Sequence, residues 1–186
     1  MNLSIGTQLF HRKSITISGE KVCDIDDESL NLCDEHALII KYFNDKTNGK
    51  RLASRQDLQP FDMVASLPFI TLFDIFYDKK GMVADLQFRL QGTSMVDFYG
   101  EWTGRSILKD DGKECLKSVY PETYERLISI AQTALDKRKP FVFCSKQVSQ
   151  AYYYLTIESL VVPMSDDGEN INILFTHSSM KTTTQS

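Results

Sequence analysis

Long hydrophobic runs and an excess of basic residues are both missing from this sequence of 186 residues. No stretch approaches the roughly 18 apolar residues that a membrane-spanning helix needs, and the N-terminus lacks the charged start and apolar run of a secretory signal. The net charge of −4 argues against a general nucleic-acid-binding protein, which normally presents a basic face. We therefore expect neither a nucleic-acid partner nor a membrane partner.

Cysteines are few, and their spacing is not that of metal ligands. The four cysteines lie at positions 23, 33, 115 and 144, with no CxxC pair and no zinc-type spacing. Such cysteines, in a chain without a secretory signal, are typical of reduced thiols, so we expect a cytoplasmic protein. The hydrophobic content of 42% and charged content of 25% are those of a globular domain, and the length suits one domain with a real core.

Signatures of catalysis are missing as well. His11, His36 and His177 are scattered, and no serine stands in a Gly-x-Ser-x-Gly elbow. Glu158 lies on an expected strand among apolar neighbours and is either a buried carboxylate with a raised pKa or a residue of a solvated face. We predict that the protein is not an enzyme. A small cone-fold enzyme, which needs an acid–base pair in a pocket, is an alternative.

An acidic stretch before the first expected helix matches a calcium-binding loop only in part. Asp24, Asp26, Glu28 and Glu35 occupy positions one, three, five and twelve of that template. The template requires glycine at position six, where this sequence has Ser29. We therefore predict no metal site and interpret the acids as the favourable negative start of a helix.

Hydrophobic periodicity predicts an α+β fold. Helical spacing is found over 29–45, from Pro60 and from Pro121 to about residue 139, with a strand and turn over 14–22. Apolar or alternating segments predict strands over 69–77, 85–92, 141–148, 152–163 and 171–177. Strands joined by short turns imply an antiparallel sheet, with helices packed on one face.

The segment that follows the second of these strands is rich in glycine. Gly92, Gly100 and Gly104 do not have the Gly-x-Gly-x-x-Gly spacing of a dinucleotide site, and no Gly-Lys-Ser/Thr follows them. We predict that they serve turns, with Thr93 or Ser94 capping a helical turn.

Alternation in the preceding strand assigns its two faces. Leu86, Phe88 and Leu90 are expected to point inward, and Arg89 toward solvent. With apolar residues from the helices, the inward side chains either line a ligand cavity or fill the core. The candidate cavity residues are Phe88, Leu90, Met95, Phe98, Trp102, Tyr124, Leu127 and Phe143.

Four motifs follow one another within residues 51–178: Arg55-x-Asp57-x-x-Pro60, Phe88-Arg89-Leu90-x-Gly92-Thr93, Thr103-Gly104-Arg105 and Pro163-x-Ser165-x-Asp167-Gly168. Taken in order, they resemble a PAS domain, in particular a stand-alone PAS-like family common in proteobacteria. The residues expected to have structural roles are Arg55, Asp57, Gly92, Thr93, Gly104, Arg105, Asp167 and Gly168. Arg55 and Asp57 are expected to form an ion pair or cap, and Arg105 to lie near a carboxylate.

The resemblance implies a five-stranded antiparallel sheet curled around a small interior and flanked by helices. Residues 1–50 would form an extension with one amphipathic helix, and 179–186 a flexible tail. The cofactor is unknown. Haem is disfavoured because haem-binding PAS domains use a histidine on the long helix, and none lies between Cys115 and Lys139. Photoactive flavin is disfavoured because "KECLKS" departs from the Asn-Cys-Arg-Phe-Leu-Gln motif.

A sensory or interaction role follows from the same resemblance. We expect a non-catalytic PAS-like signalling protein that binds a small ligand, a protein partner or both, and that signals in trans to a separate protein. The N-terminal helix is expected to be a homodimer contact or a lid. The alternative is a ligand-free adaptor that acts through protein–protein interaction.

Overall fold

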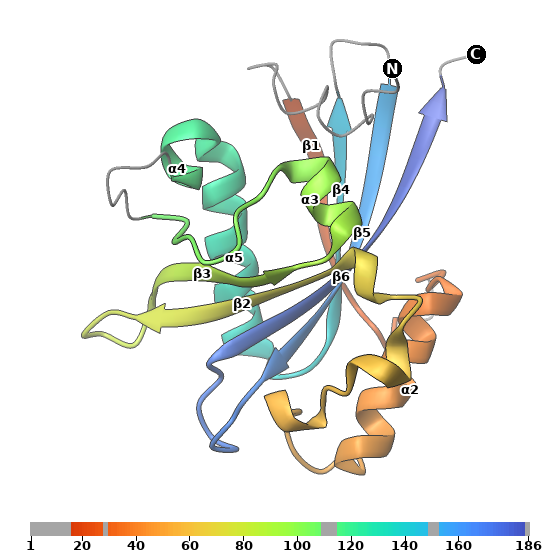
Figure 1. The fold of residues 1–186 in the computed structure, drawn as a ribbon, viewed down its shortest axis with the longest axis vertical. Coiled ribbons are helices and arrows are strands. Elements are labelled where there is room, and N and C mark those ends of the chain that lie inside the picture. Colours follow the sequence, from red (N-terminus) through yellow and green to blue (C-terminus); the bar gives the residue numbers. More distant parts are fainter. Residues whose placement is uncertain (1–15, 28–29, 109–114, 149–152, 185–186) are drawn as a thin grey trace.

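The chain forms one six-stranded sheet with helices on both faces (Figure 1). The computed structural model describes residues 16–27, 30–108, 115–148 and 153–184. The strands are β1 (Thr16–Asp24), β2 (Ile70–Tyr77), β3 (Val83–Gln91), β4 (Phe141–Val148), β5 (Tyr153–Met164) and β6 (Ile173–Thr184). Their order is β1-β4-β5-β6-β2-β3, and all neighbours are antiparallel. The α+β fold class is confirmed, with six strands where five were expected.

Helix chemistry explains the start of α5 and the end of α2. They are α2 (Asp34–Thr47), α3 (Thr93–Tyr99), α4 (Leu116–Val119) and α5 (Pro121–Lys137), with the 3-10 helices η1 (Arg55–Asp57), η2 (Pro60–Met63) and η3 (Leu67–Phe69). Pro121 occupies the first turn of α5, where its missing N–H costs nothing. α2 begins later than the predicted residue 29 and ends before Asn48, whose φ of 52° is left-handed.

Each face of the sheet buries its own core. We call them the α5-side core, which includes Phe73, Phe88, Trp102, Phe141 and Leu174, and the α2-side core, which includes Ile39, Phe43, Leu72, Leu160 and Phe175. Figure 1 shows α5 and α2 on opposite sides of the strands. The prediction that all helices lie on one face was wrong for α2, because Phe43 packs on Phe175 of the other face at a ring-centroid distance of 5.1 Å.

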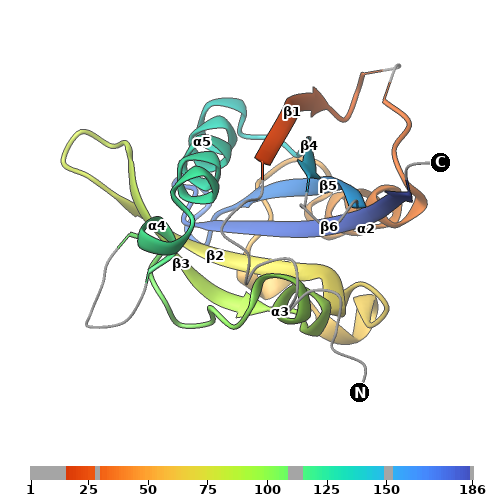
Figure 2. The same ribbon diagram turned by 90° about the horizontal axis from the view of Figure 1, so that it is seen from above.

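The N-terminal segment is part of the sheet. β1 pairs with β4 from Thr16, opposite Val148, to Asp24, opposite Phe141 (Figure 2). Lys137 at the end of α5 donates to Asp24 Oδ1 at 2.8 Å. β6 pairs with β5 as far as Thr184, within the segment expected to be a tail. The expected boundaries at residues 50 and 178 therefore do not separate an extension or a tail from the sheet.

Candidate ligand-binding cavity

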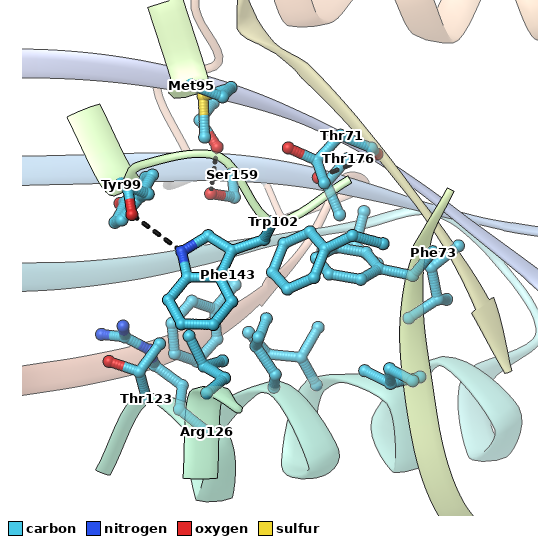
Figure 3. Close-up of a pocket in the computed structure, with 18 of the residues that line it drawn as sticks. Thr71, Phe73, Met95, Tyr99, Trp102, Thr123, Arg126, Phe143, Ser159 and Thr176 are labelled. Carbon is cyan, nitrogen blue, oxygen red and sulfur yellow. Dashed lines mark hydrogen bonds between the residues drawn. The ribbon is translucent and has the colours of Figure 1, made fainter. Parts of the chain in front are cut away.

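A cavity of about 100 Å³ lies in the α5-side core, between the sheet and α5 (Figure 3). An engineered apolar cavity of ~150 Å³ holds benzene, so this space suits a compact ligand. Most of its walls are apolar, as in small-molecule sites generally. The apolar lining residues are Phe73, Leu86, Phe88, Met95, Trp102, Leu116, Leu127, Ile130, Phe143, Ile157, Val161 and Leu174.

An aromatic wall connects the sheet to the segment after β3. The Phe88 ring lies 4.7 Å from that of Phe73 and 6.3 Å from that of Trp102, centroid to centroid. Trp102 Nε1 donates to the carbonyl oxygen of Tyr99 at 2.8 Å (Figure 3). Arg105 lies over the Trp102 ring, 5.5 Å from its centroid. The indole N–H is thus satisfied within its own segment, and the ring serves as an apolar wall.

The glycines of this segment have two different roles. Gly100 and Gly104 have φ values of 80° and 79°, as predicted for turns. Gly92 has an ordinary φ of −68°, but a Cβ there would lie 2.2 Å from the carbonyl oxygen of Leu67 and 2.4 Å from that of Pro68. Close approach of η3, and not an unusual φ, therefore requires glycine at position 92.

The wall formed by the sheet carries hydroxyl groups. The hydroxyl-bearing residues of this wall are Thr71, Ser145, Ser159, Thr176 and Ser178. Thr176 Oγ1 donates to the carbonyl oxygen of Thr71 at 3.2 Å, and the hydroxyls of Ser159 and Ser178 are 2.9 Å apart. Polar atoms amid apolar walls are what orient a ligand in a pocket.

Arg126 is the charged residue among the side chains that line the cavity, and Thr123 lies one turn before it on α5 (Figure 3). Within the described chain, its buried Nη1 has no hydrogen-bond partner, and none of the ion pairs includes Arg126. Burial lowers the pKa of Arg126 because it disfavours the charged form, while Tyr99, Glu20 and Glu122 act in the opposite direction. Nη1 of this half-buried side chain is thus a buried donor with no acceptor among the described residues.

Most of the candidate cavity residues do meet at this site. Those that line it are Phe88, Met95, Trp102, Leu127 and Phe143. Leu90, Phe98 and Tyr124 are not among its lining residues. The ring of Phe98 lies beside Tyr99 at 5.7 Å, and Lys117 Nζ lies 4.9 Å from the centroid of the Tyr124 ring.

A β-bulge explains the position of Leu90. Leu72 is opposite Leu90, but the next residue of β2, Phe73, is opposite Phe88, so that Arg89 is an extra residue on β3. The bulge interrupts the alternation and turns Leu90 to the other face, where it is 38% exposed. The prediction that Leu90 points inward was therefore wrong, whereas Arg89 is exposed as predicted.

The motif that begins at Arg55 forms a cap, but its ion pair contains a different arginine from the one predicted. Asp57 accepts hydrogen bonds from Arg51 at 2.6 and 2.7 Å and from the Ser54 amide at 2.8 Å. These contacts, the one with Arg51 above all, hold the pKa of Asp57 well below its usual range. Arg55 donates its backbone N–H to Asp166. The cap is confirmed, but the ion pair involves Arg51 and not Arg55.

The remaining motif residues shape two turns. Gly92 is the N-cap of α3, and no side-chain cap bond forms there, so the predicted capping by Thr93 or Ser94 was wrong. Asp167 Oδ1 accepts from the backbone N–H groups of the two residues after Gly168, at 2.8 and 2.7 Å, and Gly168 has a φ of 85°. This turn joins β5 to β6, where the Asp-Gly pair predicts a hairpin.

Two of the acidic residues considered for calcium, Asp24 and Asp26, form ion pairs with lysines. Asp24 lies within ion-pair distance of Lys137, and Asp26 lies 3.6 Å from Lys139. Glu28 falls outside the described residues. Glu158 is an ion-pair partner of Lys181 at 3.7 Å. No group of three potential metal ligands occurs in the part of the chain that the structure describes.

His36 and His177, which are far apart in the sequence, contact each other on the α2 side of the sheet. His36 and His177 are 0% and 3% exposed, and their rings lie edge to face at 5.2 Å. His36 Nε2 donates to the carbonyl oxygen of His177 at 3.2 Å. Burial lowers the pKa of both, that of His177 to about 4.

Sequence reasoning missed Arg126. The apolar stripe of α5 was recognised from Tyr124, Leu127 and Ile128, yet Arg126 precedes Ile130 by one turn and so shares the face that lines the cavity. A charge at i−4 from a core residue is the signal that points to it. His11, the third histidine considered for catalysis, lies outside the described residues.

The comparisons with known proteins agree with this architecture. The family model of the PAS domain matches residues 34–176, and the chain therefore belongs to the PAS domain family. PAS domains are in general sensory or interaction modules. No curated protein and no solved structure matches the chain significantly. Among the described helices, none has the length and apolar character needed to cross a bilayer.

Proposed function

We propose that this protein is a non-catalytic sensory protein that binds a small ligand in the α5-side cavity and signals to a separate protein. The observation that carries the proposal is the cavity itself, which is lined by the sheet, α5 and an aromatic wall and carries hydroxyls and one guanidinium. Among the described lining residues there is no Asp, Glu, His or Cys to act as an acid–base pair, which favours binding over catalysis.

Binding of a ligand would change the packing of α5 and of the segment after β3. Leu127 and Ile130 of α5 and Met95 and Trp102 of the segment line the same space as the sheet. A ligand that binds better to one packing of these elements shifts the population toward it, and so changes the surface they present to a partner. The four cysteines are free thiols, which is consistent with a protein of the cytoplasm.

A thermal-shift screen with a library of small metabolites, followed by native mass spectrometry, tests the proposal. A ligand at one hundred times its Kd stabilises the folded state by about 2.7 kcal/mol, which corresponds to a Tm increase of roughly 5–10 °C for a chain of this length. Ser145→Leu places a larger side chain in the cavity and should abolish the shift. The matched control is Ser129→Leu, on the exposed face of α5, which should retain it.

A ligand-free adaptor would give the opposite pattern. Neither variant would then differ from the wild type in the screen, and no member of the library would raise the Tm. That result would reject ligand binding and leave the interaction role of the family.

We propose that the protein forms a homodimer through the outward-facing side of α2 alone. His36, Ile39 and Phe43 are buried within the same chain, so only outward-facing residues such as Leu38, 66% exposed, remain for a second copy. Light scattering of the wild type and Leu38→Lys measures this. A wild-type dimer that Leu38→Lys converts to a monomer supports the contact, whereas a monomeric wild type rejects it.

A further inference from the structure

We propose that the cavity binds a small apolar or aromatic monocarboxylate, with its carboxylate on Arg126 and its hydrocarbon part against Phe88 and Trp102. The inference rests on the proposed ligand-binding function and adds the chemical class of the ligand. It also assigns Arg126 as the residue that selects for charge.

The unsatisfied guanidinium is the first argument. A buried charged donor without a partner costs free energy, and folded proteins normally pair it. Arg126 Nη1 is buried and has no hydrogen-bond partner among the described residues. Glu20 and Glu122 are near enough to influence its charge but are exposed and form no ion pair with it. An acceptor from outside the chain would complete this site.

The shape of the donor decides between kinds of anion. A guanidinium presents parallel N–H groups that match the two oxygens of a carboxylate. A phosphate ester carries about two negative charges, and sites for it usually gather several cations or helix N-termini. Here the described lining residues supply one cation, with the Thr123 hydroxyl one turn away. One cation balances one carboxylate.

The rest of the cavity determines the size and polarity of the other end of the ligand. Figure 3 shows Arg126 and Phe73 at opposite ends of the space, with Trp102 between them. The far end is formed by buried apolar side chains, and the volume of about 100 Å³ is smaller than the ~150 Å³ of an apolar cavity that holds benzene, so the hydrocarbon part of the ligand is at most one ring. No carboxylate lines the described cavity, so a cationic ligand would have no partner there.

A pair of probes that differ only in charge tests the inference on the full chain. Benzoate and benzamide share size and shape, and the methyl resonance of Met95, a lining residue, reports occupation of the cavity in methionine-methyl NMR titrations. We expect both to shift this resonance and benzoate to bind about 10- to 100-fold more tightly, since a hydrogen bond to a charged group contributes ~1.5–3 kcal/mol. Arg126→Gln should reduce benzoate affinity to that of benzamide.

A matched variant separates local from general effects of charge. Lys80→Gln removes one positive charge from an exposed turn and should leave the preference for benzoate intact. Arg126→Met replaces the side chain by an uncharged one of similar length, should Arg126→Gln not fold. Equal wild-type affinities for the two probes would overturn the inference even without either variant.

Each outcome has one meaning. Equal affinities for benzoate and benzamide, or a preference that survives in Arg126→Gln, overturn the carboxylate inference but leave the ligand-binding function standing. If neither probe shifts the Met95 resonance, the carboxylate inference is rejected, and the ligand-binding function is decided separately by the thermal-shift screen.

Discussion

Replacement of His177 by glutamine should make the stability of this protein less sensitive to mild acid. His177 is 3% exposed, and burial, together with the neighbouring His36, lowers its pKa to about 4. The unfolded chain titrates near 6.5. Below that pH the unfolded state binds a proton that the folded state does not, so stability is full above about pH 6.5 and falls as the pH decreases toward 4.

The expected loss can be calculated. Near pH 5, a histidine with pKa values of about 4 in the folded state and about 6.5 in the unfolded state destabilises the protein by about 2 kcal/mol relative to neutral pH. His36 adds to this in the same direction, because burial also lowers its pKa. Asp57 does not interfere at this pH, since its carboxylate remains ionised in both states.

Urea unfolding near pH 7.5 and near pH 5 provides the assay. The wild type should lose about 2 kcal/mol more than His177→Gln between the two conditions. Comparison of the two losses, and not of absolute stabilities, removes the packing cost of the substitution. Losses that agree within about 0.5 kcal/mol would refute the argument that His177 is held neutral by burial.

Three further predictions concern stability and reactivity. Gly92→Ala should lower the free energy of unfolding in urea by about 2–4 kcal/mol, because its Cβ would overlap the carbonyl oxygen of Leu67. The control Gly49→Ala, which has open space around it and a φ of 62°, should lower it by only about 1–2 kcal/mol. Equal losses of stability in the two variants would contradict this prediction. Asp57→Ala should cost about 1–2 kcal/mol through loss of the cap, and a change below about 0.3 would contradict the cap. Cys144, whose pKa is raised to about 11 by burial, should react with iodoacetamide about 100-fold more slowly than an unhindered thiol near pH 8; a free-thiol rate would contradict burial.

Periodicity predicted the strands and the two long helices, but not which side of the sheet each helix covers. An amphipathic stripe shows that α2 has an apolar face, yet both faces of this sheet are apolar and both bury a core. The contact of Phe43 with Phe175 joins residues far apart in sequence, so no local pattern contains it.

The candidate site was predictable where side chains follow regular alternation and not where the register changes. Phe88 and Phe143 lie on regular stretches of strand and line the cavity. Leu90 lies beyond a bulge whose position is set by hydrogen bonding to β2, which the sequence of β3 does not encode alone. Arg126 was overlooked because charges on helices are usually solvated, and only the fold shows its guanidinium against the cavity.

The pairing of β1 with β4 has a consequence for how the protein is divided. The family match begins at Asp34 and ends at Thr176, inside β6. A fragment cut at these limits therefore loses β1 and the part of β6 after Thr176 that pairs with β5. The backbone N–H and C=O groups of β4 would then form a bare edge, which recruits strands from other chains. The folding unit is thus larger than the region of family similarity, because β1 completes the pairing of β4 from outside that region.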